Sequence, residues 1–474
     1  MNFGQMGCAA VGWMRMLPET PQSVAALEIA RTLRRHGHQA YFAGGCVRDL
    51  VLGCAPKDYD VATSARPELV LDMFPRAFGV GAKFGVVLVA MECAGTSVLT
   101  EVATFRADGS YSDGRRPDAV RYTLSAEEDV LRRDFTINGL LLDPERALES
   151  GDIRGAVLDF VDGLKDIQAG LIRAIGAPGS RFEEDHLRLL RGVRFAARIN
   201  FVIEDLTRSA MAAMAHTLDQ VSRERVRDEL TRMLTEGRAR HAFEALAETS
   251  MLAVVLPEIE RMRGVEQPPE FHPEGDVWEH TLRLLDQLAA GCSKTLAWGA
   301  LLHDAGKPAT FQRAPDRIRF DGHVEVGARI AEEICRRLRF SNEESAQIAS
   351  LVANHMRFGD VERMKASTLK RFFQLPHFEE HLALHRLDSM AASGRLKHWQ
   401  FAKDRWEAMP AEEVRPVPLV TGRELIAAGY RPGPRFKQIL HAVEDTQLEG
   451  AITTADEAMA LVRRLFPIDE VNGD

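Results

Sequence analysis

Apolar residues recur along the chain at the spacings of strands and of helices. Both spacings occur in the first third of the chain, and the helical spacing dominates after it. Val24, Leu27, Ala30 and Leu33 fall roughly on one face at helical spacing and predict a helix over residues 22–36. Short apolar runs beyond it predict strands, and helical pieces such as Pro67–Phe74 lie between them. The predicted strands are Ala40–Ala43, Asp58–Thr63, Gly85–Met91, Val98–Phe105 and Phe135–Leu142. This alternation predicts a mixed sheet covered by helices.

Two clusters of proline interrupt the helical part of the chain, one near Pro268 and one near Pro416. Proline lacks the backbone N–H that a helix interior needs, so such clusters mark boundaries. With the change of pattern near Asp166, they predict a multidomain α+β protein. Its predicted parts are an N-terminal extension at 1–21, a mixed head at 22–166, an all-α neck at 167–265, a second helical domain at 266–406 and a tail at 407–474.

The composition is that of a soluble globular protein, and it limits the possible partners. Of the 474 residues, 45% are hydrophobic and 27% charged, and no run reaches the ~18 apolar residues of a membrane helix. The six cysteines include no Cys-x-x-Cys pair, so we expect reduced thiols and a cytoplasmic protein.

The charge of the chain restricts any contact with nucleic acid to a local surface. The net charge is −9, so no membrane or DNA partner is expected. The segment Arg181–Arg240 is a candidate RNA-binding surface, because it holds 12 arginines, no lysine and 10 acidic residues. Nothing in the sequence indicates an oligomeric state.

A glycine pair and an Asp-x-Asp motif lie close together near the start of the head. Gly44 and Gly45 let the backbone approach a phosphate, and Arg48 follows three residues later. Asp58 and Asp60 are spaced so that both carboxylates fall on one face of a strand, which suits Mg²⁺. Either motif alone is usually a turn or a solvated face, whereas the combination favours a metal and triphosphate site. Glu101, on a later predicted strand, is a candidate third carboxylate.

Two further motifs can recognise a nucleotide. Asp134 and Asn138 are able to hydrogen-bond sugar hydroxyls, and the preceding Arg132 and Arg133 supply positive charge. Farther on, Asp185 and Arg188 are three residues apart on a predicted helix and so would be neighbours. A carboxylate beside a guanidinium can mimic a complementary base edge that accepts the exocyclic amine of cytosine or adenine. Without other context, such a pair is usually a surface ion pair.

Histidines and aspartates form a second constellation in the later helical region. His280, the adjacent pair His303 and Asp304, and Asp388 follow in order, and His323 and His355 lie between them. Imidazole and carboxylate together suit Mg²⁺ or a divalent transition metal such as Mn, Fe, Ni or Zn. The alternative is a set of core histidines with no metal.

The motifs of the first half resemble those of the class II tRNA nucleotidyltransferase and bacterial poly(A) polymerase family, within the polymerase-β nucleotidyltransferase superfamily. The resemblance runs from about residue 25 to residue 235. It implies a polymerase-β-like head and an RNA-binding neck. It also implies two-metal transfer, in which Asp58 and Asp60 hold Mg²⁺ and help activate a tRNA 3′-OH.

The resemblance also assigns the nucleotide-binding residues. Gly45 and Arg48 would hold the triphosphate, and Arg133, Asp134 and Asn138 would read the ribose. In the family, a Glu-Asp-x-x-Arg helix is the protein template for CTP and ATP, and its counterparts here are Glu184, Asp185, Arg188 and Arg191. Ser222–Leu230 resembles a neck motif that steadies this helical turn, and Gly109–Pro117 resembles the loop of enzymes that add the complete CCA.

The second constellation resembles the HD phosphohydrolase superfamily. His280, His303, Asp304 and Asp388 match its metal ligands, and His323 and His355 match positions that add a second metal in some members. Some tRNA nucleotidyltransferases with this domain have phosphatase or 2′,3′-cyclic phosphodiesterase activity, so cleaning of tRNA 3′ ends is a hypothesis for this chain.

The sequence therefore predicts an enzyme that builds or repairs the 3′-terminal CCA of tRNA from CTP and ATP. Close alternatives are a CC-adding enzyme, an A-adding enzyme and a poly(A) polymerase. A metal-dependent HD hydrolase with a head that only binds RNA, and an RNA-binding protein with no activity, are alternatives from other classes. The intact Asp-x-Asp and Arg-Arg-Asp motifs disfavour the last of these.

Overall fold

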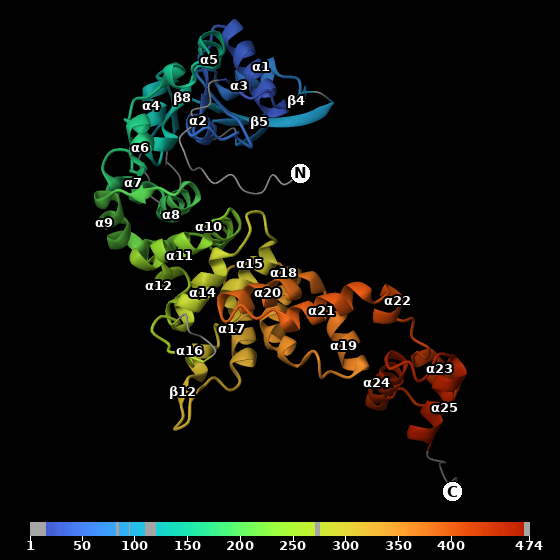
Figure 1. Ribbon diagram of the computed structural model, residues 1–474. Helices are drawn as coiled ribbons and strands as arrows, with labels where there is room; N and C mark the ends of the chain where they lie inside the picture. Colours follow the sequence, from blue (N-terminus) through green and yellow to red (C-terminus); the bar gives the residue numbers. More distant parts are fainter. Residues whose placement is uncertain (1–15, 82–84, 94, 110–119, 271–274, 469–474) are drawn as a thin grey trace. The chain divides into compact units, whose positions relative to one another are not determined.

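The computed structural model describes residues 16–81, 85–93, 95–109, 120–270 and 275–468 (Figure 1). It divides into two compact units, Met1–Glu260 and Arg261–Asp474. The loop expected at Gly109–Pro117 lies almost entirely outside the described residues. Among the described helices, none has both the length and the apolar composition needed to cross a lipid bilayer.

The first unit is built on a mixed seven-stranded sheet, as expected from the sequence. The strand order is β3-β4-β5-β2-β1-β8-β9, in which β2 and β5 are parallel and the other neighbours antiparallel. The strands are β1 Ala40–Ala43, β2 Asp60–Thr63, β3 Ala77–Gly81, β4 Val86–Cys93, β5 Thr96–Thr104, β8 Leu141–Leu142 and β9 Val157–Leu158. Helix α1 (Pro21–Arg35) packs its buried face, including Ile29 and Leu33, against β1, β2, β4 and β5 (Figure 1).

Short helices connect the strands and carry most of the polar motifs. They are α2 Gly45–Val51, α3 Pro67–Met73, α4 Ala126–Leu131, the 3-10 turn η2 Thr136–Asn138, α5 Pro144–Ser150 and α6 Gly163–Ala169. Small two-stranded pairs β6–β7 (Arg106–Asp108 and Val120–Tyr122) and β10–β11 (Leu171–Ile172 and Val202–Ile203) complete the unit.

The predicted strand Phe135–Leu142 is wrong, because the segment forms η2 and only two residues of β8. Polar side chains there bind local groups, which competes with a regular ladder. The Asp134 carboxylate accepts the N–H of Phe135 at 2.8 Å, and the Thr136 hydroxyl donates to Asp166 at 2.7 Å. The strand predicted at Asp58–Thr63 starts later, at Asp60, so Asp58 precedes it.

The rest of the first unit is mostly helical, although the range predicted as an all-α neck also contains β10 and β11. Its helices are α7 Pro178–Glu184, α8 Arg188–Ile199, α9 Asp205–Met214, η4 Ala215–Gln220, α10 Arg223–Thr235, α11 Ala239–Glu248, α12 Met251–Val255 and α13 Pro257–Glu260. The single helix expected through Asp185 and Arg188 is wrong. Asp185 is extended at φ −149° and ψ 104°, and its carboxylate accepts the N–H of Leu187 at 3.1 Å, so a new helix begins there.

The second unit is almost entirely helical. Helices α15, α18 and α20 contact one another, α14 contacts α15 and α20, and α17 packs on α18 (Figure 1). The bounds are α14 Val277–Asp286, α15 Lys294–Leu302, α16 Lys307–Thr310, α17 His323–Arg337, α18 Asn342–Asn354, η5 His355–Asp360, α19 Ala366–Phe373, α20 Phe378–Ala391, α21 Lys397–Ala408 and α22 Ala411–Val414. A short hairpin, β12 Gln312–Arg313 with β13 Ile318–Arg319, interrupts them.

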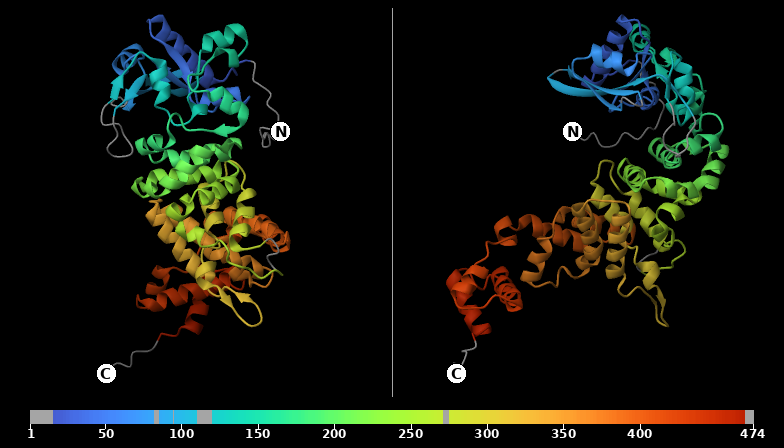
Figure 2. Two further views of the ribbon diagram at one scale, coloured as in Figure 1. Left: turned by 90° about the vertical axis from the view of Figure 1, so that its left-hand side faces the viewer. Right: turned by 180° about the vertical axis from the view of Figure 1, so that it is seen from behind.

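The tail of the second unit has an apolar core of its own. Helices α23 Gly422–Ala427, α24 Pro434–Leu448 and α25 Ala455–Leu465 surround it, and Figure 2 shows them in red as a small group. Leu425, Ile439 and Val462 are fully buried in this core. A separate core around Phe358 and Phe372 holds α19, α20 and α21 together.

Candidate functional site

Three carboxylates meet where β2 and β5 run side by side. Asp60 and Glu101 each directly precede the paired residues Val61 and Val102 of these parallel strands. Burial and the negative charges of Glu101 and Asp58 together raise the pKa of Asp60 to about 6, and the charge of Arg133 opposes them. Asp58 and Glu101 are exposed, so both carboxylates are open to a ligand. Carboxylates that repel one another in a half-buried site are suited to a divalent cation, which would neutralise their charge.

The glycine pair ends β1 and begins α2. Gly44 has φ +70°, and a Cβ there would lie 3.2 Å from Nη1 of Arg133, so glycine allows this arginine to come close. Arg133 therefore lies between the Gly-Gly turn and the carboxylates. Arg133 and Arg132 both donate to Asp129, which is buried in α4. Burial alone would raise the pKa of Asp129, but the two guanidinium groups lower it. Asp129 is not among the predicted site residues, although its spacing of three and four residues from the arginines is typical of ion pairs on a helix.

Arg48 lies inside the protein in this structure and is only 2% exposed. Its Nε and Nη2 donate to Asp49 at 2.8 and 2.6 Å, and its Nη1 donates to Asn138 at 2.7 Å. A direct contact of Arg48 with a triphosphate therefore stays a prediction. The sequence analysis did not assign a role to Asp49, which holds this guanidinium.

The ribose motif is joined to helix α8. Asn138 donates to Asp134 at 3.2 Å, and the second oxygen of Asp134 accepts from Nε of Arg191 at 2.8 Å. Burial alone would raise the pKa of Asp134, but the charges of Arg191 and Arg188 and the hydrogen bonds lower it to about 2. Asp134 is therefore ionised at neutral pH.

The structure separates Asp185 from Arg188, so their predicted pairing is wrong. Both oxygens of Asp185 accept from Arg225 of α10, at 3.1 and 2.8 Å. Arg188 instead donates to Glu184 at 2.5 Å and to the carbonyl oxygens of Arg181 and Arg132 at 3.0 Å. The break between α7 and α8 turns the two side chains toward different partners. Each is still held in place by an oppositely charged group.

The second unit gathers all six predicted histidines and aspartates. His280, His303 and Asp304 lie close enough to share one ion, and Asp304, His323 and His355 form a second such group. Asp388 completes the first group, because its Oδ1 lies 3.1 Å from Nε2 of His280. Asp304 belongs to both groups and bridges them.

The donor atoms of this cluster fit a metal. Nδ1 of His303, His323 and His355 each bonds a backbone carbonyl, at 2.9, 2.9 and 2.7 Å. A carbonyl only accepts, so each Nδ1 carries the proton and each Nε2 has a free electron pair. Nε2 of His323 and of His355 is buried and has no hydrogen-bond partner among the described residues. Each lies 3.9 or 3.8 Å from Oδ1 of Asp304, too far for a hydrogen bond and suitable for an ion between them.

Lys307 also reaches this cluster, and the sequence analysis gave it no role. Its Nζ lies 2.7 Å from Oδ2 of Asp304 and donates to Gln267 at 2.6 Å. It is 6% exposed. Burial alone would raise the pKa of Asp304, but the charges of His303, Lys307 and His280 lower it well below its usual value.

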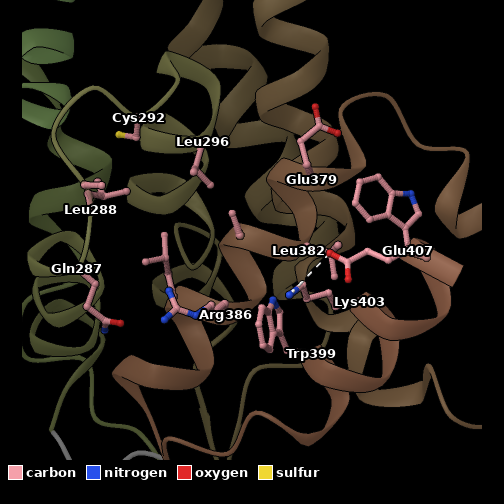
Figure 3. Close-up of a pocket in the computed structure, with 14 residues that line it drawn as sticks. Gln287, Leu288, Cys292, Leu296, Glu379, Leu382, Arg386, Trp399, Lys403 and Glu407 are labelled. Carbon is pink, nitrogen blue, oxygen red and sulfur yellow. Dashed lines mark ion pairs between the residues drawn. The ribbon is translucent and has the colours of Figure 1, made fainter. Parts of the chain in front are cut away.

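A cavity of about 360 Å³ lies elsewhere in the second unit (Figure 3). It is bounded by the connection between α14 and α15, by one face of α20 and by α21. Arg386 and Lys403 approach the ring of Trp399, at 5.8 and 5.3 Å from its centroid. None of the six residues of the metal cluster lines this cavity, so it is a separate feature.

Family comparisons match three segments of the chain. Residues 40–173 match a poly(A) polymerase head domain, residues 200–262 a probable RNA and SrmB-binding site of polymerase A, and residues 277–392 an HD domain. The first two segments contain the carboxylate site and α10. The third contains all six residues of the metal cluster.

Two of the related proteins are both named CCA-adding enzyme. A CCA-adding enzyme of Levilactobacillus brevis is 30% identical over 437 residues, which cover 92% of this chain and 96% of that protein. A CCA-adding enzyme of Geobacillus kaustophilus is 42% identical over 233 residues, so the match spans about half of each protein, 49% of this chain and 54% of the relative.

Solved structures of similar proteins resemble both halves of the chain. The crystal structure of the Bacillus stearothermophilus CCA-adding enzyme in complex with CTP has a TM-score of 0.70 and 26% identity, and covers 94% of this chain and 98% of that one. A Thermotoga maritima CCA-adding enzyme complexed with tRNA has a TM-score of 0.56 at 16% identity, covering 96% of this chain and 98% of that one, and shows the fold alone.

Proposed function

The chain belongs to the CCA-adding enzyme family, and we propose that it adds or repairs the 3′-terminal CCA of tRNA from CTP and ATP. The observation that carries this proposal is the arrangement within the first unit. Asp58, Asp60 and Glu101 share one site with Arg133, and Arg133 also borders the Gly-Gly turn. A cation site beside a phosphate-binding turn suits nucleotidyl transfer.

The reaction joins the 3′ oxygen of tRNA to the α-phosphorus of the nucleotide and breaks the bond to pyrophosphate. Asp58 and Asp60, with Glu101 beside them, would hold Mg²⁺, which supplies activation of the 3′-OH and neutralises phosphate charge. Arg133 adds positive charge where the triphosphate would pass. Asp134 and Asn138, held by Arg191, would contact the ribose hydroxyls.

The free thiols of the five described cysteines agree with a cytoplasmic location.

Base selection falls to Asp185 and Arg188 in this proposal. The Asp185 carboxylate would accept the exocyclic amine of cytosine or adenine, which uracil and guanine do not present at that place. Arg188 would donate to a ring nitrogen or a carbonyl oxygen of the base. Arg225 and Glu184 hold the two groups in place without a base, so little reorganisation is required when one binds.

A primer-extension gel tests the proposal. The protein with Mg²⁺ receives tRNA that ends at the discriminator base, with CTP alone, ATP alone or both. Growth by two nucleotides with CTP and by three with both supports CCA addition. A product that stops at two with both nucleotides identifies a CC-adding enzyme, and a long tail from ATP alone identifies a poly(A) polymerase. No growth on any end contradicts the proposal.

A second activity is favoured by the orphaned Nε2 atoms of His323 and His355 around Asp304. We propose that this cluster binds divalent metal and hydrolyses phosphoesters at damaged tRNA 3′ ends. Asp304→Ala should abolish the hydrolytic opening of a tRNA 2′,3′-cyclic phosphate to a phosphomonoester, whereas Asp58→Ala should leave this reaction intact. Equal hydrolysis by metal-depleted protein would refute this second activity.

A further inference from the structure

A continuous chain of polar contacts leaves helix α8 at one end and returns to it at the other. It begins at Arg191, which bonds Asp134, and Asp134 bonds Asn138. Asn138 accepts from Arg48 at 2.7 Å, and Arg48 donates to Asp49. The second oxygen of Asp49 then accepts from Nη2 of Arg198 at 3.1 Å. Arg191 and Arg198 are seven residues apart on α8, so the circuit closes through two turns of this helix.

The middle of this circuit is buried. Arg48 is 2% exposed, Asn138 and Asp134 are each 7% exposed and Asp49 is 9% exposed. Buried polar groups keep their partners, because a lost hydrogen bond leaves an unsatisfied donor or acceptor. The four side chains are therefore expected to move together with α8.

The ring of Phe195 on α8 contacts two arginines of the circuit and also Arg194. The guanidinium carbons of Arg48, Arg191 and Arg194 lie 5.2, 5.1 and 4.3 Å from the centre of its ring. Cations over an aromatic face are attracted to it. Phe195 thus holds Arg48 of the Gly-Gly segment and Arg191 of the base-reading segment against one side chain.

Arg198 is the member of the circuit that none of the sequence motifs included. It pairs with Asp49 from the last turn of α8, far along the helix from Arg188 at its first turn. Its side chain is 33% exposed, so its removal does not open a cavity in the core. Its contact with Asp49 ties the end of α8 to the segment that holds Arg48.

We propose that Arg198 and Asp49 are positioning residues for nucleotide selection. They hold the Gly-Gly segment and the ribose motif at a fixed place relative to α8, which carries the base-reading Arg188. A nucleotide must touch all three segments at once, so a loosened circuit weakens its binding and its discrimination. This inference rests on the proposed function, since it takes Arg188 as a base-reading group.

The first test compares Arg198→Ala, Arg198→Lys and Asp49→Asn with a control, Arg35→Ala. Arg35 is an exposed arginine of α1 paired with Glu28, outside both the circuit and the segment Arg181–Arg240. Binding of CTP with Mg²⁺ is measured by calorimetry without tRNA, and KM and kcat are measured for CTP, ATP and UTP. We expect Arg198→Ala to weaken CTP binding about tenfold and to raise the use of UTP relative to CTP, with the KM for tRNA changed less than about twofold. Arg198→Lys should recover part of the loss, and the control should match wild type.

A double-mutant cycle then tests the link between the two residues. If they act through each other, Arg198→Ala should have little further effect on CTP binding in the Asp49→Asn background. Unchanged CTP binding and UTP use in Arg198→Ala would overturn the inference. Additive losses of CTP binding in the double variant would also overturn it. So would a loss of CTP binding in Arg198→Lys that equals the loss in Arg198→Ala and accompanies a lowered Tm. If Arg198→Ala does not fold, Arg198→Lys and Asp49→Asn decide by the same measurements. A wild-type chain that binds CTP but adds no CCA would contradict the proposed function and leave these binding tests valid.

Discussion

At the scale of single residues, the charged Asp60 carboxylate lowers the free energy of unfolding of the protein. Its ordinary pKa of 3.8 is raised to about 6 by burial and by the nearby carboxylates. Between these two pH values the folded chain keeps a proton that the unfolded chain has lost. The free energy of unfolding therefore falls as pH rises through this window and stays lower above it.

Asp60→Asn should therefore make the metal-free protein more stable while it abolishes nucleotide addition. We expect a gain of about 1–2 kcal/mol in the free energy of unfolding at pH 7 with EDTA, and a smaller gain near pH 4. Denaturant unfolding at both pH values measures it. Asp205→Asn, at an aspartate whose side chain is 86% exposed, is the control and should change little. An equal gain at both pH values would show that the carboxylate charge is not the cause.

Arg225 is the residue on which the orientation of Asp185 depends. Arg225→Ala removes both hydrogen bonds to that carboxylate, so Asp185 should turn more freely and select the base less strictly. We expect kcat/KM for CTP to fall about tenfold or more, and UTP incorporation to rise relative to CTP. Single-nucleotide addition assays with each of the four nucleotides measure this. Arg227→Ala, two residues along α10, is the matched control, because Arg227 pairs with its neighbour Asp228. Unchanged selectivity in Arg225→Ala would contradict the role of Arg225.

The sequence predicted which residues belong to each site better than it predicted which side chains pair with one another. The predicted ligands His280, His303, Asp304 and Asp388 do meet, because α14, the end of α15 and α20 bring them to one place. The pairing of Asp185 with Arg188 failed. A spacing of three residues implies contact only on a continuous helix, and the extended backbone at Asp185 ends α7 before α8 begins at Arg188. Partners distant in sequence, such as Arg225 and Arg198, have no local signal at all.

At the scale of elements, helix α8 depends on close packing at Gly192. A Cβ there would lie 2.9 Å from the ring of the buried Phe135 and 2.9 Å from the end of Met211. Phe135 precedes η2, so the packing of α8 fixes its distance from the ribose motif.

Gly192→Ala should therefore destabilise the first unit, although alanine favours helices. We expect a loss of about 1–3 kcal/mol from overpacking, partly offset by a helix-propensity gain of about 1 kcal/mol. Gly179→Ala on α7 is the control, because nothing lies within 4 Å of its added Cβ. Thermal unfolding followed by circular dichroism compares the two variants. A Tm for Gly192→Ala at or above that of Gly179→Ala would contradict the packing argument.

The helices of the second unit also divide the metal ligands between them. His280 comes from α14 and His303 directly follows α15, whereas His323 begins α17 and His355 directly follows α18. His323→Ala should therefore remove one of two bound metals and leave the other. Metal content after loading with Mn²⁺ and desalting measures this, and His381→Ala, a buried histidine of α20 outside the cluster, is the control. Loss of both metals, or of neither, would contradict two groups bridged by Asp304.

The elements themselves were predicted best where one physical signal dominates. Helix α1 and strand β1 are confirmed, but the predicted apolar face of α1 is only partly right, because Ala30 and Leu33 are buried whereas Val24 is 47% exposed. The segment Phe135–Leu142 has the apolar content of a strand, and its polar side chains override that pattern. Such an override depends on partners like Asp166, which lies 30 residues from Thr136.

At the scale of the whole molecule, an acidic protein has to hold a polyanion. The net charge of −9 opposes binding of RNA at long range, so affinity must come from local arginines such as those of the neck. The affinity for tRNA should therefore fall roughly tenfold or more between 50 and 200 mM KCl, because the release of counterions from the phosphates is less favourable at higher salt. Filter binding at several salt concentrations measures the slope, and the calorimetric affinity for CTP should change less. A flat dependence for tRNA would contradict a phosphate-dominated interface.

The histidines that donate Nδ1–H to their own backbone have a consequence for proton exchange. Burial lowers the pKa of His323 and, together with the charge of His303, lowers that of His355 to about 4, against about 6.5 for a free imidazole. These two rings carry no extra proton in neutral solution, so a metal displaces none from them. His323 and His355 should accordingly add no buffer-dependent term to the heat of metal binding. A cell that acidifies by one pH unit from neutrality would leave His355 unprotonated and still able to bind a metal.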